Sequence, residues 1–482
     1  MLRGAGWGLL MRWGNRFIGI FNLMIIARLL TPTEIGVVAL ATLLSSLILQ
    51  FYEIGIAMLL IRKQDIDSSD CNTAWTMRMV LAVILGGVML LLAPTAAGYF
   101  DEPRMIDVIY VIALSFVISS GANVGMILAR RELDFAKDFR YNIYSRFLTF
   151  LITVALALWL RNAWAIVFGT LFGTILTVIL SFRMHPYRPR IDFSKYKEYL
   201  VFGLSIVPIN IGQYLLKKIA PWIVGGVATT NQFVAYNMGS DLAGVFTEQV
   251  VGSIGRGQFP NYSRILDKPK LLATAFSHEL TVVAGLILPL AVGLAVVAGD
   301  AVPVLLGDQW DHMVPLLPWL SIYSALAALL TLLTGQILIA TSHERLSASL
   351  LWARLAILAP MAYFAGQAAG AEGVAKAVVA ATVLAIPLAI VALTWSKVIS
   401  LLQILRALWR PVIAVLIMAV AISYLHVADV KLAIVRLALD AAVGGTVYFG
   451  AVVLLWLIAG RPEGPESAIV GKLTKAKVGA AE

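Results

Sequence analysis

The sequence predicts an all-α polytopic membrane protein with about fourteen transmembrane helices. Of its 482 residues, 60% are hydrophobic and only 13% are charged, whereas a soluble chain of this size carries about 25% charged residues. The apolar residues fall into separate runs of roughly 18–25 residues, which is the length that a helix needs to cross a bilayer. A transmembrane β-barrel would instead alternate apolar and polar residues over strands of about ten residues, and the sequence lacks that pattern.

The predicted spans follow these apolar runs in order, and the seventh and eighth are the most polar of them. The spans are residues 13–30, 37–60, 74–93, 106–129, 141–160, 163–182, 199–219, 234–254, 272–298, 314–339, 347–364, 374–393, 411–426 and 433–458.

The distribution of basic residues predicts that both termini lie in the cytoplasm. When the loops are assigned alternately to two sides, 25 of the 37 Lys and Arg residues fall on the side of the N-terminus. The opposite loops hold only Arg104, Arg161 and Lys431, and the other nine basic residues lie within predicted spans. Cytoplasmic loops of helical membrane proteins carry such an excess. The net charge of +10 therefore reflects topology, and no nucleic-acid partner is predicted.

A faint internal repeat predicts two parallel lobes. Thr31–Ala39 resembles Thr229–Asn237 at an offset of 198 residues, and each segment lies between the first two helices of a six-helix block. An even number of helices per block leaves both lobes in the same orientation, with the substrate path around a central cavity between them. The predicted parts are an N-terminal six-helix lobe (1–182), a cytoplasmic linker (183–198), a C-terminal six-helix lobe (199–393), two additional helices (394–458) and a cytoplasmic tail (459–482).

Charged residues inside the predicted spans are candidates for a substrate-binding lumen. A buried cation costs at least about 2.5 kcal/mol even on a forgiving insertion scale, so such residues normally face a water-filled cavity or pair with one another. The excess of cations favours a lumen that attracts anions. A structural role at the interface is favoured for Arg28, which lies near a span end. The lumen candidates are Arg16, Arg28, Glu53, Arg78, Arg146, Lys217, Lys218 and Arg354, and the candidates for coupling to H⁺ or Na⁺ are Glu53, Asp241 and Glu248.

No motif predicts an enzyme, a metal site or a bound cofactor. The sequence has no Gly-x-x-x-x-Gly-Lys-Ser/Thr phosphate loop, and its five histidines lack the spacing of metal ligands. The Gly-rich segment Gly252–Gly257 follows no predicted strand, so it is interpreted as a helix-packing feature. These absences favour a transporter.

Several short motifs, taken in order, resemble Wzx-type polysaccharide flippases, most closely the branch that includes the colanic-acid exporter. The resemblance covers about residues 10–345. Its motifs are Ile26–Gly36, Tyr52–Ile56, Ile61–Gln64, Arg131–Phe135, Tyr187–Phe193 and Leu306–Trp310 followed by Pro315.

This resemblance implies membership of the multidrug/oligosaccharidyl-lipid/polysaccharide exporter superfamily, with two six-helix lobes around a cavity and often two further helices. Its polysaccharide members move undecaprenyl-diphosphate-linked oligosaccharides across the bacterial inner membrane. The implied partners are this polyprenyl-diphosphate-linked oligosaccharide, membrane lipids, and a polysaccharide polymerase and chain-length regulator. By position, Arg16, Arg28 and the motif Glu53–Gly55 match residues that serve the cavity of related lipid II flippases.

Three alternatives stay open from the sequence. One is a multidrug or small-solute antiporter of the same superfamily. Another is a passive scramblase. The third, from a different class, is a membrane-embedded polysaccharide polymerase or ligase, which typically has a large extracytoplasmic loop, whereas such loops are short here.

Overall fold

The computed structural model describes residues 2–52, 55–63, 65–132, 134–396, 398–425 and 432–461. These residues form α-helices joined by short connections, with one 3-10 helix and no β-strand among them. The chain divides between Val234 and Ala235 into two compact units. The predicted all-α fold class is confirmed.

Nine helices in the described part of the chain are long and apolar enough to cross a membrane, and the protein is a multi-pass membrane protein. Every predicted span overlaps a described helix, and the spans 347–364 and 374–393 fall on the two halves of one long helix. The structure is consistent with fourteen crossings, and that number stays a prediction.

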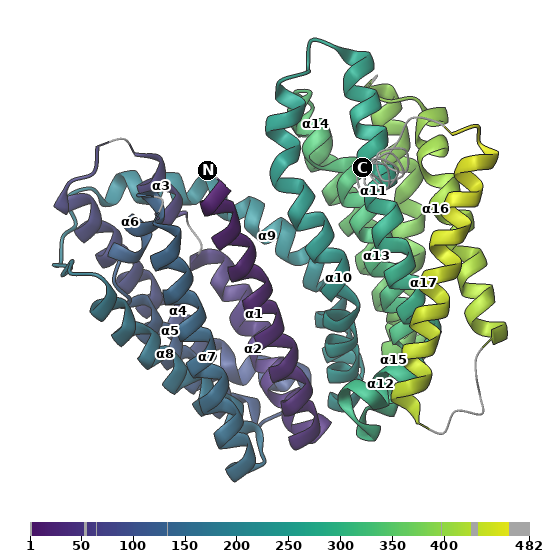
Figure 1. Cartoon of the computed structure of the whole chain (residues 1–482). Helices are drawn as coiled ribbons and strands as arrows, with labels where there is room; N and C mark the ends of the chain where they lie inside the picture. The colour runs from purple at the N-terminus through teal and green to yellow at the C-terminus, as the bar shows by residue number, and fades with distance from the viewer. Residues whose placement is uncertain are drawn as a thin grey trace, which may run out of the picture. The chain divides into compact units, whose positions relative to one another are not determined.

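The first unit contains long helices that pack lengthwise, with two short helices at one end (Figure 1). Its elements are α1 (Leu2–Leu29), α2 (Pro32–Tyr52), α3 (Ile56–Arg62), α4 (Ser68–Phe100), α5 (Met105–Ser120), α6 (Gly125–Arg131), α7 (Phe135–Leu160), α8 (Ala163–Met184), α9 (Tyr196–Val227) and the start of α10 (Thr230–Ser263).

Two predicted spans of the first unit are each divided into a long and a short helix. The span 37–60 becomes α2 and α3, because Gly55 adopts a left-handed backbone conformation with φ of 70°. The span 106–129 becomes α5 and α6, which are separated by a turn at residues 121–124. The short helices α3 and α6 pack against each other, so the polar loops around them gather at one end of the unit.

Helices α7 and α8 approach closely because α8 presents glycines to threonines of α7. A Cβ on Gly169 would lie 2.4 Å from Thr153 Oγ1, and one on Gly173 would lie 2.3 Å from Thr149 Oγ1. Small residues spaced by four let membrane helices pack at short range. This contact explains why α7 and α8 form one tight pair, against which α1 packs through α7.

The other end of the first unit is held by Glu34 in the first turn of α2. Its side chain accepts hydrogen bonds from the backbone N–H of Ala163 (2.7 Å) and from Arg104 (3.1 Å). Thr33 also donates to Asn231 Oδ1 at 2.8 Å. These two residues are 198 positions apart, which is the offset of the internal repeat. The two repeat segments therefore contact each other through equivalent residues.

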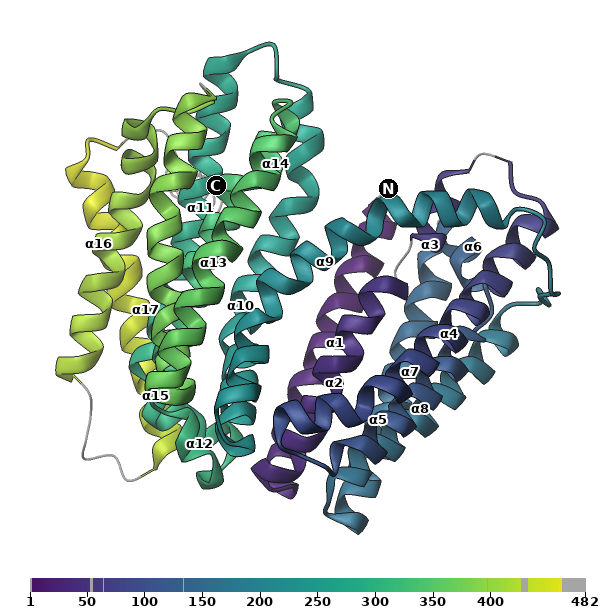
Figure 2. The same cartoon turned by 180° about the vertical axis from the view of Figure 1, so that it is seen from behind.

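The second unit is built around α11, with α13 packed on it from one side and α16 from another (Figures 1 and 2). Its elements are the rest of α10, α11 (Pro269–Val296), α12 (Ala298–Leu306), the 3-10 helix η1 (Asp308–Met313), α13 (Leu317–Thr334), α14 (Gln336–Ala340), α15 (Glu344–Trp395), α16 (Leu401–Leu425) and α17 (Ala433–Ile458).

Helix α15 consists of two helical halves joined at a kink, where the backbone angles of Ala369 and Gly370 are not helical. Gly370 has φ of 58°, a conformation that glycine adopts at little cost. The two predicted additional helices, α16 and α17, are packed into this unit: Tyr448 donates to the carbonyl of Gly285 at 2.8 Å. Helix α9, which begins the predicted C-terminal lobe, packs against α2 and α4 of the first unit. The predicted lobe boundaries stay a prediction.

Candidate functional site

Two of the predicted lumen arginines, Arg16 and Arg146, lie on the adjacent helices α1 and α7. A Cβ on Gly19 would be 3.5 Å from Arg146 Nη2, and Gly19 is less than one helical turn from Arg16. Arg16 is half-buried, and its Nε and Nη2 are enclosed without any hydrogen-bond partner. The Arg146 side chain is exposed. The α1–α7 pair therefore presents a second cation close to an unsatisfied buried guanidinium.

A third predicted arginine, Arg78 on α4, is held in place by a neutral partner. Its Nε donates to the hydroxyl of Tyr52 at 3.1 Å, and the Tyr52 ring packs edge-on against Phe116 at 4.8 Å. A phenol does not neutralise a guanidinium, so Arg78 keeps its charge. Glu53, predicted as a lumen and coupling residue, lies outside the described residues.

The remaining candidates are distributed over both units. In the first unit, Arg28 is exposed in the last turn of α1, as expected for a residue near a span end. Lys217 and Lys218 lie on α9, the first exposed and the second half-buried.

In the second unit, Arg354 of α15 is half-buried near Tyr323 of α13. Asp241 lies exposed on α10, and Glu248 is on the same helix. Within the first unit, Arg146 thus lies against α1 within one helical turn of Arg16. Their roles stay predictions.

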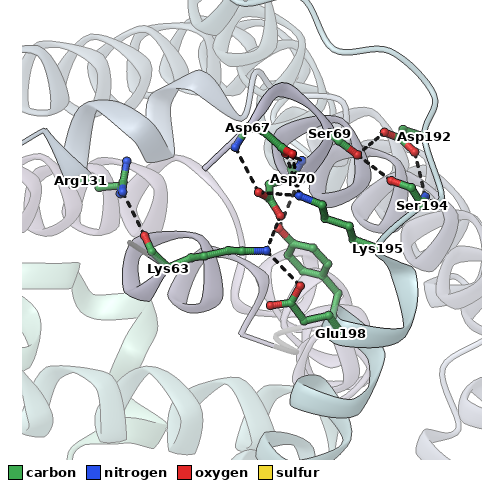
Figure 3. A network of polar contacts seen from close by, with 10 residues as sticks. Lys63, Asp67, Ser69, Asp70, Arg131, Asp192, Ser194, Lys195 and Glu198 are labelled. Carbon is green, nitrogen blue, oxygen red and sulfur yellow. Dashed lines mark hydrogen bonds and ion pairs between the residues drawn. The ribbon is translucent and has the colours of Figure 1, made fainter. Parts of the chain in front are cut away.

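Sequence reasoning missed a dense polar cluster at the α3–α6 end of the first unit, which we call the loop network. Its centre is Asp70, whose side chain is only 1% exposed and contacts Lys63 (2.7 Å) and Lys195 (3.0 Å) (Figure 3). Lys63 also contacts Glu198, and Lys195 contacts Asp67. The members of the loop network are Lys63, Asp67, Ser69, Asp70, Arg131, Asp192, Ser194, Lys195 and Glu198.

The loop network exists because α4 begins with a capping box. Asp67 accepts from the backbone N–H of Asp70 at 2.8 Å, and Asp70 accepts from that of Asp67 at 3.2 Å. This reciprocal arrangement satisfies helix-end donors and directs both carboxylates to the same side. The spacing of two aspartates by three residues before an apolar run is the sequence signal that could have found it.

Three of the motifs that carry the family resemblance meet in the loop network. Lys63 belongs to Ile61–Gln64, and its carbonyl accepts from Arg131 at 3.0 Å. Asp192, from the segment 187–193, accepts from Ser69 at 2.7 Å. Motifs far apart in the sequence therefore serve one structural purpose, which is to fasten the connection between α8 and α9 to the start of α4.

The electrostatics of the loop network are self-compensating. Its three basic residues face four acidic ones. Hydrogen bonding to Asp70 raises the pKa of Lys63, and hydrogen bonding to Lys195 lowers the pKa of Asp67. Because its acidic and basic side chains stabilise each other's charged forms, the loop network has no surplus cation for a substrate. Among the described residues of the first unit, Arg16 has enclosed guanidinium nitrogens that lack a hydrogen-bond partner.

Comparison with known proteins gives relatives in polysaccharide biosynthesis. The chain is 26% identical over 368 residues to a membrane protein in the cps region of Klebsiella pneumoniae, covering 75% of this chain and 76% of that protein. It is 23% identical over 377 residues to the lipopolysaccharide biosynthesis protein WzxC of Escherichia coli K12, covering 77% and 76%.

Solved structures share the fold at low sequence identity. The lipid II flippase MurJ, in an inward-closed conformation, aligns with a TM-score of 0.76 at 11% identity, over 94% of this chain and 99% of that chain. An inward-facing multidrug resistance transporter of the MATE family aligns with a TM-score of 0.57 at 15% identity, over 82% and 95%. The predicted superfamily fold is confirmed.

The family model described as polysaccharide biosynthesis protein matches residues 25–315. Together with the named relatives, this match confirms the predicted resemblance to Wzx-type flippases and the prediction of a transporter-type protein that is not an enzyme. The chain belongs to the polysaccharide biosynthesis protein family.

Proposed function

We propose that this protein moves a polyprenyl-diphosphate-linked oligosaccharide from the inner to the outer leaflet of the bacterial cytoplasmic membrane. The family supports a role in polysaccharide biosynthesis, and the fold is shared with a flippase whose named cargo is lipid II. Moving a diphosphate through hydrocarbon unaided is prohibitive. The protein must therefore provide a polar, cationic path for the head group, while the polyprenyl tail stays in lipid.

The observation that carries the proposal is the enclosed, unpartnered guanidinium of Arg16 beside Arg146. A buried charged donor without an acceptor is costly, and a phosphate oxygen would satisfy it with a strong, charge-assisted hydrogen bond. Two nearby cations suit a dianionic diphosphate. Arg78, oriented by Tyr52, supplies a third cation on the same unit.

The proposed mechanism is alternating access between two six-helix lobes, 1–182 and 199–393, connected by the linker 183–198. Both termini lie in the cytoplasm, consistent with the bias of basic loops. Transport is coupled to an ion gradient, and the protein works beside a polysaccharide polymerase and chain-length regulator. The two additional helices within 394–458 pack on the second lobe.

The test uses a cell whose surface polysaccharide depends on this gene. Deleting the gene should abolish surface polysaccharide and leave the lipid-linked repeat unit in the inner leaflet. At equal protein level, Arg146→Glu should reduce surface polysaccharide at least about tenfold, because a carboxylate repels the diphosphate, whereas Arg146→Lys should retain most of it.

The matched control is Arg140→Glu, at an exposed arginine on the same helix that donates to the Ala136 carbonyl of its own helix. Normal polysaccharide from Arg146→Glu would remove this residue from the mechanism. If deletion leaves polysaccharide intact and sensitises the cell to cationic drugs, the protein is a multidrug antiporter.

A further inference from the structure

A half-buried carboxylate in the second unit lies outside every role assigned so far. Glu279 is on α11, ten residues after the helix starts at Pro269, which is about 15 Å along its axis. It is half-buried, and α11 is one of the helices able to cross a membrane. An acidic residue at such depth needs a partner or a function.

Both oxygens of Glu279 are held by neutral donors from the end of α10. The Tyr262 hydroxyl donates to Oε2, and the Gln258 amide donates to Oε1. Tyr262 is only 2% exposed, and its ring packs against Phe276 of α11 at 6.4 Å. The carboxylate therefore lies between α10 and α11, hydrogen-bonded on both oxygens and next to packed aromatic rings.

No cation neutralises this carboxylate within the described part of the chain. Helix α16, which packs along α11, carries Arg406 and Arg410, and α11 itself carries His278. Among the described residues, the groups that act on Glu279 are Tyr262 and Gln258. The stretch of α13 that packs beside α11 is uncharged.

This environment suits a proton better than a metal ion. Desolvation penalises the ionised carboxylate, and the neutral acid relieves that penalty without a counter-ion. In the described arrangement both partner groups direct hydrogens at the carboxylate, whereas a hard metal ion such as Ca²⁺ or Mg²⁺ is bound by several oxygen ligands. A tyrosine hydroxyl can rotate from donor to acceptor, which lets the same partners serve both protonation states.

We propose that Glu279 is the proton-binding residue through which this protein couples transport to a proton gradient. The proposal rests on the transport function proposed above and names its coupling ion and site. A proton from the aqueous phase binds a carboxylate oxygen, and the Tyr262 hydroxyl then turns to accept from it. The joint between α10 and α11 changes from a charged clamp to a weaker neutral contact, which biases the helices toward a different packing.

Proton binding is tested without any substrate, by infrared difference spectroscopy on the purified full chain in lipid vesicles. The carbonyl band of a protonated carboxylic acid should be lost as the pH is raised, and Glu279→Gln should lack that band. The control Glu372→Gln, at an exposed glutamate of the same unit that is paired with Lys376, should keep it. Tyr262→Phe should move the midpoint of band loss to higher pH, since one donor to the charged form is gone. A band that persists in Glu279→Gln overturns the assignment.

Coupling is tested in the same vesicles with undecaprenyl diphosphate that carries one fluorescent N-acetylglucosamine. A gradient of one pH unit should accelerate its movement by the wild type by up to about tenfold, the driving factor that one coupled proton supplies. Glu279→Gln should lose the acceleration that the wild type shows. Equal acceleration of both proteins, or acceleration by a Na⁺ gradient alone, overturns the proposal. A wild type that never moves the probe refutes the transport function, and the infrared result then still decides whether Glu279 binds a proton.

Discussion

The first unit treats charge in opposite ways in two regions. In the loop network, Asp70 is buried between Lys63 and Lys195, and every acidic member has a described donor. Along α1 and α7, Arg16 has enclosed nitrogens without a hydrogen-bond partner, and Arg146 lies beside Gly19, less than one helical turn from Arg16. The charges of the loop network are paired within it, whereas Arg16 has enclosed nitrogens that no described residue pairs.

This difference separates charges that maintain the fold from charges that await a ligand. Burying a paired charge is tolerated when its remaining hydrogen-bonding groups are satisfied, whereas an unpaired one costs free energy in every state of the protein. A family can retain such a cost when a substrate relieves it. We therefore expect substitutions in the two regions to affect different quantities: transport for the arginines and stability for the loop network.

The largest expected effect follows from Arg16→Ala. Transport should fall about 10–100-fold, because one charge-assisted hydrogen bond to a phosphate is worth about 1.5–3 kcal/mol. The free energy of unfolding in detergent should stay the same or rise, since an unsatisfied buried charge has been removed. Arg16→Lys should be intermediate, because it keeps the charge and loses the planar fork.

Two measurements on the same preparation decide this prediction, vesicle transport and thermal unfolding. Arg140→Ala serves as the exposed control on α7. If transport and unfolding temperature fall together in Arg16→Ala, Arg16 is a structural residue and the contrast between the two regions is lost.

A smaller effect, of the opposite kind, is expected from Asp70→Asn. The amide keeps the shape and one acceptor of the capping box but leaves Lys63 and Lys195 without their shared buried charge. We expect the free energy of unfolding to decrease by about 2–3 kcal/mol, because one side of a buried ion cluster is lost. Transport per folded molecule should change less than about twofold.

Chemical unfolding in detergent measures the first quantity, and transport normalised to folded protein measures the second. Asp65→Asn, at an exposed position in the same connection outside the loop network, should change neither. A fall in normalised transport without loss of stability would instead place Asp70 in the transport mechanism.

Much of the fold could be predicted because the apolar run of a membrane helix can be recognised in the sequence. The predicted spans overlap described helices throughout. Element ends were harder: α2 stops at Tyr52 because Gly55 takes a left-handed conformation, and α9 continues to Val227 past two lysines. Neither feature depends on hydropathy. The first is a backbone preference of one residue, and the second is tertiary packing.

Less of the site could be predicted, because the sequence shows which residues are charged but not which residues they contact in the fold. Spacing placed Arg78 and Arg146 inside spans but could not reveal Tyr52 or Gly19 as what they contact. Only three residues of the loop network, Lys63, Arg131 and Asp192, lie in the family motifs. Most of its ion pairs join segments more than a hundred positions apart, such as Lys63 and Glu198. Long-range pairing of this kind has no local signature.

The smallest effect should be the pH response of the loop network. The pKa of Asp67 is lowered by Lys195 and that of Asp192 by Ser69, so their stabilisation is fully present above the unfolded pKa of about 3.9 and is lost as pH falls below it. The pKa values of Lys63 and Lys195 are raised by their carboxylate partners, so their stabilisation is present below about 10.4 and is lost as pH rises through the raised values. Between these limits none of these four groups, Lys63, Asp67, Asp192 and Lys195, changes protonation. The difference in unfolding temperature between wild type and Asp67→Asn should therefore be constant from about pH 5 to pH 9. A difference that shrinks between pH 7 and pH 5 would show that the loop network takes up protons itself, and proton coupling could no longer be assigned to the second unit alone.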